Sequence, residues 1–186
     1  PYMDEKGVKQ TVTDYTLLTG YESADDEVFQ KSGWFVVQGE VTYDGNFAFG
    51  LKNLVDVHLI LADGAKLTVR ISGPVFNNLA IYAQSTGENK GQFEINGSIT
   101  VQGDFVLNGG IVNVSITNGF MAILVNGLFS VNGGIVNVSI ANGFTAILVN
   151  GLFSVNGGIV NALVTGDYSS GIRATMFAIN GGSVTA

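Results

Sequence analysis

The chain has 186 residues, 46% of them hydrophobic, which excludes a disordered chain and leaves ample length for a core. A net charge of −7 excludes the basic surface that nucleic-acid binding needs, and the lack of cysteine excludes disulfides and thiol chemistry. Asparagine and glycine interrupt every apolar run before it reaches the about 18 residues that a membrane span requires.

Charged residues are concentrated in the N-terminal part of the chain. Of the 15 acidic residues, 14 lie at or before Asp104, and no charged residue occurs from Phe105 to Gly166. We therefore divide one continuous domain into a capping segment at 1–32, irregular coils at 33–104 and regular coils at 105–186. A polar cap is expected because the end strands of a solenoid expose unpaired backbone groups.

Five short runs rich in β-branched and aromatic residues follow the capping segment, and each predicts a strand. They are GWFVV at 33–37, VHLIL at 57–61, KLTVRI at 66–71, NLAIYAQ at 78–84 and GQFEING at 91–97. Alternation along the second run places His58 on the outer surface.

From Phe105 onward the sequence repeats every 24 residues. The aligned columns are Phe105, Phe129, Phe153 and Phe177; Asn108, Asn132, Asn156 and Asn180; and Phe120, Phe144 and Tyr168. Each period contains three β-branched runs, such as LFSV, IVNVSI and TAILV, bounded by the turn signals NGG or NG. A repeat of this length is typical of a solenoid.

Three strands and three turns in 24 residues predict one coil of a parallel β-helix. A series of Asn-Gly hairpins is the alternative, but hairpins give no reason for identical residues at a fixed interval. In parallel coils, equivalent positions lie about 4.8 Å apart and stack on one another. We predict an all-β fold, a right-handed single-stranded parallel β-helix with an N-terminal cap.

Three segments of the irregular coils carry a family resemblance. GWFVVQGEVTYDG, DVHLILADGAKLTV and NLAIYAQSTGENKGQFEING resemble the start of adhesin-like β-helical domains in secreted and surface-anchored bacterial proteins. Those domains are similar to a carbohydrate-binding β-helix family related in fold to pectate lyases. The resemblance covers about residues 33–97. It implies a secreted or cell-surface location and a glycan or a cell-surface partner.

The repeat columns predict which side chains face the core. The phenylalanine column faces in, whereas the serine column beside it faces out. On the third strand, a constant period aligns Arg173 with Val125 and Val149, so we expect this column outside. An aliphatic stripe on the surface then indicates a partner-facing site. It comprises Ile123, Val125, Ile147 and Val149. The alternatives are a different strand phase, or coverage of the stripe by the N-terminal part.

The asparagine columns have two interpretations. Turn asparagines accept left-handed backbone geometry and form hydrogen bonds along a stack. The alternative is an outward row of amides that binds sugars. The first interpretation is purely structural, and the second predicts a ligand.

No residue pattern predicts a catalytic, cofactor-binding or metal-binding site. Glycoside hydrolysis needs two carboxylates about 5–10 Å apart, and the coils after Asp104 contain no acid until Asp167. His58 is the only histidine, and no cysteine is available to complete a zinc site. An alternative to the absence of a metal site is a calcium site, to which Glu40, Asp56 and Asp63 could contribute together with backbone carbonyls.

We therefore expect a non-catalytic structural or adhesin-like module that is secreted or displayed at the cell surface. The alternative is a carbohydrate-binding module, in which exposed aromatic rings stack on sugars. The candidate ligand-facing residues are Tyr43, Phe47 and Tyr82.

Self-association through the C-terminal coils is also expected. The sequence stops one strand into a new coil without a polar cap, which leaves Phe177 and unpaired backbone groups at an open end. Together with the aliphatic stripe, this end predicts either that the natural protein continues past Ala186 or that copies of the chain make contact, with the acidic N-terminal half outside the contact.

Overall fold

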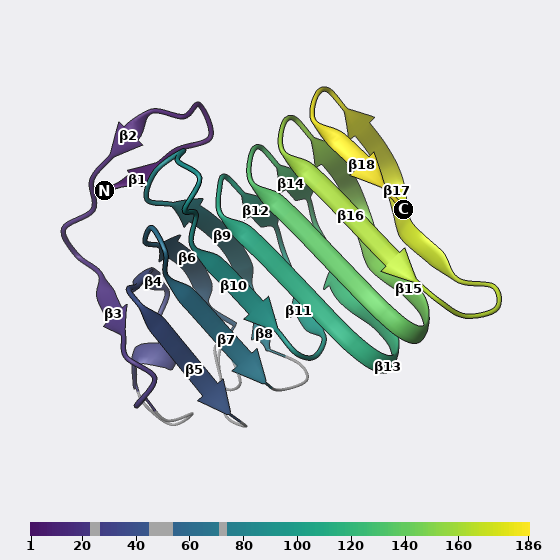
Figure 1. The fold of residues 1–186 in the computed structure, drawn as a ribbon, viewed down its shortest axis with the longest axis horizontal. Helices are drawn as coiled ribbons and strands as arrows, with labels where there is room; N and C mark the ends of the chain where they lie inside the picture. The colour runs from purple at the N-terminus through teal and green to yellow at the C-terminus, as the bar shows by residue number, and fades with distance from the viewer. Residues whose placement is uncertain (23–26, 45–53, 71–73) are drawn as a thin grey trace.

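The structure, a computed structural model, describes residues 1–22, 27–44, 54–70 and 74–186. The predicted parallel β-helix is confirmed: about six coils of about 24 residues stack along one axis (Figure 1). Three parallel sheets run along this axis, each receiving one strand from a complete coil. Within the described residues, a one-turn 3-10 helix, η1 (Glu27–Gln30), is the only helical segment, and none is long and apolar enough to cross a membrane.

The first sheet begins with β3 and continues through β4, β6, β9, β12 and β14. Their bounds are Thr16–Leu18, Gly33–Val37, Asp56–Leu61, Asn78–Ala83, Phe105–Leu107 and Phe129–Val131. The last part of β15 (Ile135–Val155) and the last part of β17 (Ser170–Ile179) complete it. This sheet carries the candidate site described below.

The second sheet consists of β5, β7, β10, the first parts of β13 and β15, β16 and β18. The bounds of the new strands are Glu40–Asp44, Lys66–Arg70, Gln92–Ile95, Ile111–Val125, Ile159–Val164 and Ser183–Thr185. The third sheet contains β8 (Val75–Phe76), β11 (Ile99–Val101), the last part of β13, the middle part of β15 and the first part of β17. The long strands β13 and β15 pass around the corner between these two sheets without a change of register.

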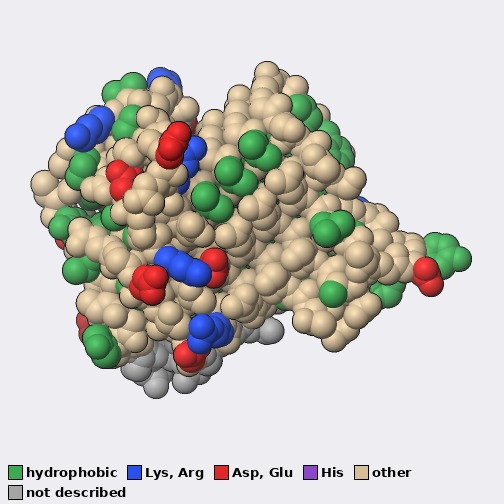
Figure 2. Space-filling view, viewed as in Figure 1, with side chains coloured by type: hydrophobic (Ala, Val, Ile, Leu, Met, Phe, Trp, Pro, Cys, Tyr) green, Lys and Arg blue, Asp and Glu red, His purple; other side chains and the backbone are tan. Residues whose placement is uncertain are grey.

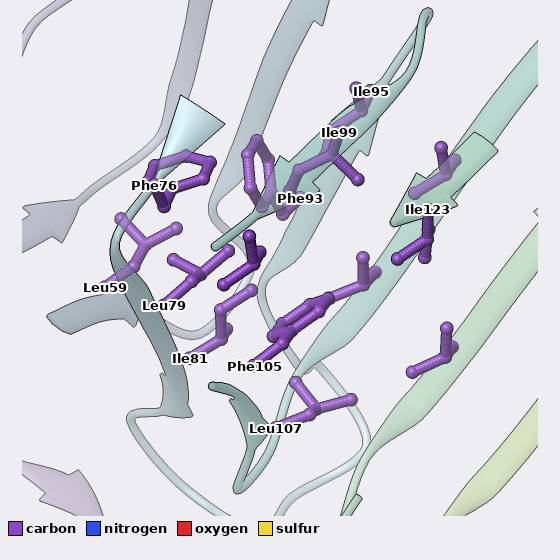
Figure 3. Packing of buried hydrophobic residues seen from close by; sticks show 14 of the residues in the cluster. Leu59, Phe76, Leu79, Ile81, Phe93, Ile95, Ile99, Phe105, Leu107 and Ile123 are labelled. Atoms are coloured by element: carbon purple, nitrogen blue, oxygen red, sulfur yellow. The ribbon is translucent and has the colours of Figure 1, made fainter. Parts of the chain in front are cut away.

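The core is a continuous column of apolar side chains between the three sheets. Figure 3 shows Leu79, Phe93, Phe105 and Ile123 pointing from separate strands into this common interior. The predicted phenylalanine stack is confirmed for Phe105, Phe129 and Phe153, which are fully buried. The rings of Phe105 and Phe129 are 4.7 Å apart and nearly parallel. Stacked coils thus place identical rings in contact, as the repeat requires.

The glycine pairs allow the coils to turn and to lie close together. The second glycine of each NGG turn has a positive φ, as at Gly134 with φ 80°. A Cβ on Gly134 would lie 2.4 Å from the carbonyl oxygen of Gly110 in the preceding coil. The expectation that asparagines adopt this left-handed geometry is wrong, because Tyr168 is the only non-glycine residue with positive φ among those described.

The asparagines instead form hydrogen-bonded ladders, which confirms the structural interpretation of these columns. Each side-chain amide donates to the amide oxygen one coil before it. In the longest ladder the distances are 2.8, 2.9 and 2.8 Å, along Asn108, Asn132, Asn156 and Asn180. A second ladder on the second sheet joins Asn113, Asn137 and Asn161. The amides are therefore largely engaged with one another.

The predicted aliphatic stripe on the third sheet is wrong. Ile123, Val125, Ile147 and Val149 are all buried, at 1% exposure or less. Arg173 pairs with Leu148, 25 residues earlier, because the turn after Thr165 contains one extra residue. A compensating irregularity restores the 24-residue spacing after Val149. Assuming a constant 24-residue period therefore exchanged the inward and outward residues of these strands. Because Val149 is buried, Val149→Lys would disrupt the core.

The segment expected to cap the N-terminal end contains three different structures. β3 pairs with β4 and so already belongs to the first sheet. The helix η1 buries Phe29 completely at this end of the core. The hairpin of β1 (Tyr2–Met3) and β2 (Lys9–Gln10) instead lies along the side of the β-helix, against β9.

The last coil exposes apolar side chains at the opposite end. Among the described residues, β17 and β18 pair only with strands of the preceding coil. Phe177 is 56% exposed, although its counterparts in the three preceding coils are buried. Figure 2 shows that charged side chains gather over the N-terminal coils, whereas the face of the C-terminal coils is mostly uncharged.

The phenylalanine stack should dominate the stability of the regular coils. Phe129→Ala leaves a cavity between two neighbouring rings and is expected to lower the free energy of unfolding by about 3–5 kcal/mol. Chemical denaturation measures this change. Phe144→Ala, at an exposed corner, is the control and should cost less than about 1.5 kcal/mol. Equal losses would contradict the inward stack.

The exposed last coil should mediate self-association of the 186-residue chain. We expect Phe177→Asp to shift light-scattering masses towards the monomer, because it places a charge on the apolar end. Phe120→Asp, on an exposed corner away from this end, should leave the association unchanged. A monomeric mass for the unmodified chain at high concentration would exclude this contact.

Candidate ligand-binding groove

A groove of about 410 Å³ lies on the outer face of β6, β9 and β12. Strand register arranges its residues in three rows that run along the helix axis. Asp56, Asn78 and Asp104 form one wall. The floor contains Ala80 and Val106, whose short side chains leave the space open. The opposite wall contains Tyr82, Asn108 and Asn132.

The first wall is held by hydrogen bonds between coils. Asp56 accepts hydrogen bonds from the side chains of Asn77 and Asn78, at 2.7 and 2.8 Å. The Asn78 amide oxygen accepts from the backbone N–H of Asp104, at 2.7 Å. Asp104 in turn accepts from the backbone N–H of Leu128, at 2.8 Å. Each acidic side chain therefore also fixes the position of a neighbouring coil.

An aromatic cluster closes the N-terminal end of the groove. Trp34 stacks on His58 with ring centres 4.5 Å apart. Tyr2, from the β1–β2 hairpin, lies 4.8 Å from the rings of both Trp34 and Tyr82. Trp34, His58 and Tyr82 are outward residues of β4, β6 and β9, so the stacking of coils brings them together. The cluster attaches the hairpin to the outer face of the first sheet.

The turn of this hairpin reaches over the groove. Asp4 fixes the turn, because its carboxylate accepts the backbone N–H groups of Lys6 and Val8 at 3.0 and 2.8 Å. Glu5 consequently lines the groove on one side of the turn. It also lines a second hollow of about 360 Å³ on the other side, together with Asn108 and Asn132.

Partial burial controls the protonation of the two titratable rings in the cluster. Burial lowers the pKa of His58, although the nearby Asp56 carboxylate opposes this shift. Burial raises the pKa of Tyr82 to about 12, with a further contribution from Tyr2 and Glu5. At neutral pH the imidazole is therefore uncharged and the phenol retains its proton, so both rings are neutral hydrogen-bonding groups.

A larger hollow lies at the corner between the second and third sheets. Its volume is about 750 Å³, and its lining contains Ser115, Thr117, Ser139 and Thr165 beside Ile116. No ionisable side chain is among the described residues that line it. The groove on the first sheet combines carboxylates, amides and an aromatic ring, so it offers far more groups for recognising a ligand.

The three aromatic residues predicted to face a ligand have different outcomes in the structure. Tyr82 lines the groove. The prediction for Tyr43 is wrong, because this residue is 4% exposed and its hydroxyl donates to the Glu22 carboxylate. Tyr43 and Val41 are the inward residues of β5, an alternation that could have been recognised in the sequence. Phe47 lies outside the described residues.

The alternative calcium site is not assembled. Asp56 starts β6, Asp63 lies in the turn after the other end of β6, and Glu40 starts a strand of another sheet. Asp63 accepts a hydrogen bond from the Ser85 hydroxyl at 2.9 Å. Among the described residues, no group of three or more histidine, cysteine, aspartate or glutamate side chains is placed to hold a metal ion.

Most of the groove has no signature in the sequence. Asp56, Asn78 and Asp104 are separated by 22 and 26 residues rather than 24, so a fixed repeat does not align them. Glu5 reaches the groove, and Tyr2 reaches the adjoining aromatic cluster, through packing of a hairpin that lies outside the repeat. The outward position of His58 is confirmed, but its stack with Trp34 required the observed register.

Comparison of the chain with protein-family models, curated proteins and solved structures gave no match. The groove must therefore be interpreted from its own chemistry.

Protonation of His58 should destabilise the fold. Its pKa is lowered in the folded state, so the unfolded chain binds the proton first as the pH falls. The contribution of neutral His58 to the free energy of unfolding is fully present above the ordinary histidine pKa of about 6.5. This contribution is lost as the pH falls through the lower pKa that His58 has in the folded state. Denaturation at a series of pH values between about 8 and 5 measures the slope.

His58→Gln provides the comparison for this slope. The variant keeps a polar side chain but cannot titrate, so its free energy of unfolding should change less over the same pH range. An unchanged slope in His58→Gln would assign the pH dependence to other groups.

Proposed function

We propose that the chain is a non-catalytic structural module, adhesin-like in character, of a secreted or cell-surface protein. The observation that carries this proposal is the uniform ladder construction of the coils from Phe105 to Gly166. In this region β13 and β15 pair residue for residue with identical partners over most of their length. Repeated contacts of this kind give a rod whose length is set by the number of coils.

The groups within the stack support a structural role. Asparagine ladders occupy most of the amides, and phenylalanine rings occupy the interior. The acidic residues of the groove, Asp56 and Asp104, hold neighbouring coils together through side-chain and backbone donors. Such groups fix a shape and position a binding surface, which is the task of a display or spacer module.

Carbohydrate binding is the second candidate function, and the groove favours it. Its walls offer carboxylate and amide groups, and its end is closed by aromatic rings. Sugar hydroxyls pair with such polar groups, and aromatic rings pack against the apolar faces of sugar rings. An adhesin-like module and a glycan-binding groove are compatible, because the rod would present the groove.

Two measurements test the proposed function. Fractionation of source cells with an antibody to the chain should recover it in the medium or at the cell surface, and a cytosolic location would contradict the proposal. Incubation with pectin, xylan and glucan should release no product. Turnover that disappears in Asp56→Asn or Asp104→Asn would show instead that the groove is an active site.

A further inference from the structure

We propose that the groove on β6, β9 and β12 binds a neutral saccharide chain along the helix axis, beneath the turn of the β1–β2 hairpin. This inference rests on the carbohydrate-binding candidate and adds the site, the ligand charge and the role of the hairpin. It is independent of the repeat that supports the structural role.

The geometry of the three rows sets the direction of the ligand. Successive strands of a parallel sheet lie about 4.8 Å apart, so each row offers a new group at this interval along the axis. The small residues Ala80 and Val106 form a low apolar floor between the two polar walls. A flat ring with hydroxyls at its edges fits this cross-section, since its faces can meet the floor and its edges the walls.

The charge of the groove selects the class of saccharide. Glu5, Asp56 and Asp104 line it, and no lysine or arginine is among its described lining residues. Uronates and other anionic sugars would face uncompensated repulsion from these carboxylates. Neutral hydroxyls can donate to the same oxygens, which act as strong acceptors. The groove therefore favours neutral saccharides over anionic ones.

Tyr82 provides a ring to this site, and its hydroxyl lies 3.4 Å from His58 Nδ1. Its phenol stays protonated at neutral pH, because burial raises its pKa to about 12. Tyr2 and the Trp34–His58 stack hold the ring in place. A fixed ring loses little conformational freedom when a sugar binds, which favours affinity.

The hairpin completes the site from outside the β-helix. Asp4 fixes the turn, and Tyr2 anchors the hairpin to the aromatic cluster, so that Glu5 stands over the groove. Tyr2 is therefore a positioning residue, which acts on the ligand through Glu5 and through the ring of Tyr82. Without this anchor the groove would lose one carboxylate and its cover.

Three oligosaccharide classes test the proposal by calorimetry on the full 186-residue chain. The neutral probes are oligomers of glucose, xylose and mannose; the anionic probe is oligogalacturonate; the cationic probe is a chitosan oligomer. We expect at least one neutral probe to bind and oligogalacturonate to fail. Binding of oligogalacturonate or of the chitosan oligomer alone would overturn the inference, as would a lack of binding by every probe.

A blocking substitution locates the binding. Ala80→Phe fills the floor from the outside and should weaken binding of the neutral probe at least about tenfold. Ala178→Phe is the matched control, because Ala178 is an outward residue of the same sheet in the last coil, far from the groove in the stack. Unchanged melting temperatures would show that both variants fold.

Substitutions in the hairpin test its role. Glu5→Gln should weaken neutral binding by about two- to tenfold, as expected for loss of a charged acceptor. Tyr2→Ala should produce at least as large a loss, because it releases both Glu5 and the Tyr82 ring, and adding Glu5→Gln to Tyr2→Ala should weaken binding little further. If neutral binding persists in Ala80→Phe, the groove is excluded while the carbohydrate-binding candidate survives at another surface. A complete absence of binding rejects both and leaves the structural role standing.

Discussion

The in-register pairing of parallel strands is the constraint on which the rest of this structure depends. It fixes the distance between equivalent residues of neighbouring coils, so each side chain contacts its own counterpart. Residues that interact well with copies of themselves are favoured: Phe105 packs on Phe129, and Asn132 donates to Asn108. The same spacing requires glycine at positions such as Gly134, where the next backbone passes too closely for a Cβ.

The irregular N-terminal coils use the same pairing for a different purpose. Here the stacked positions hold unlike residues, so that the rows contain acids, amides, aromatics and small side chains. Variation along a row creates a groove where repetition would create a uniform ladder. The two parts of the chain thus share a backbone architecture, while their outer rows differ: uniform ladders in one, and in the other the groove for which we propose saccharide binding.

The hairpin shows how a non-repeating segment can pack on the outside of a repeating scaffold. Its two short strands cannot be stable alone and depend on packing of Tyr2 against Trp34 and Tyr82. The turn of the hairpin places Glu5 over the outer face of the first sheet. A binding surface on a rigid scaffold with a covering loop is a common way to combine fixed geometry with a particular ligand shape.

The sequence by itself determined the parallel β-helix, the inward phenylalanine column and the coil length, because identical residues at a fixed interval have one simple structural cause. It could not determine strand phase where that interval changes. One additional residue after Thr165 moved Arg173 from the Val149 column to the Leu148 column and reversed the inferred orientation of the third sheet. Only the tertiary structure decided this, since side chains alternate with every residue and a shift of one exchanges inside for outside. The groove depended on tertiary structure for the same reason: Asp56, Asn78, Asp104 and Glu5 have no common spacing, and only coil stacking and hairpin packing bring them together.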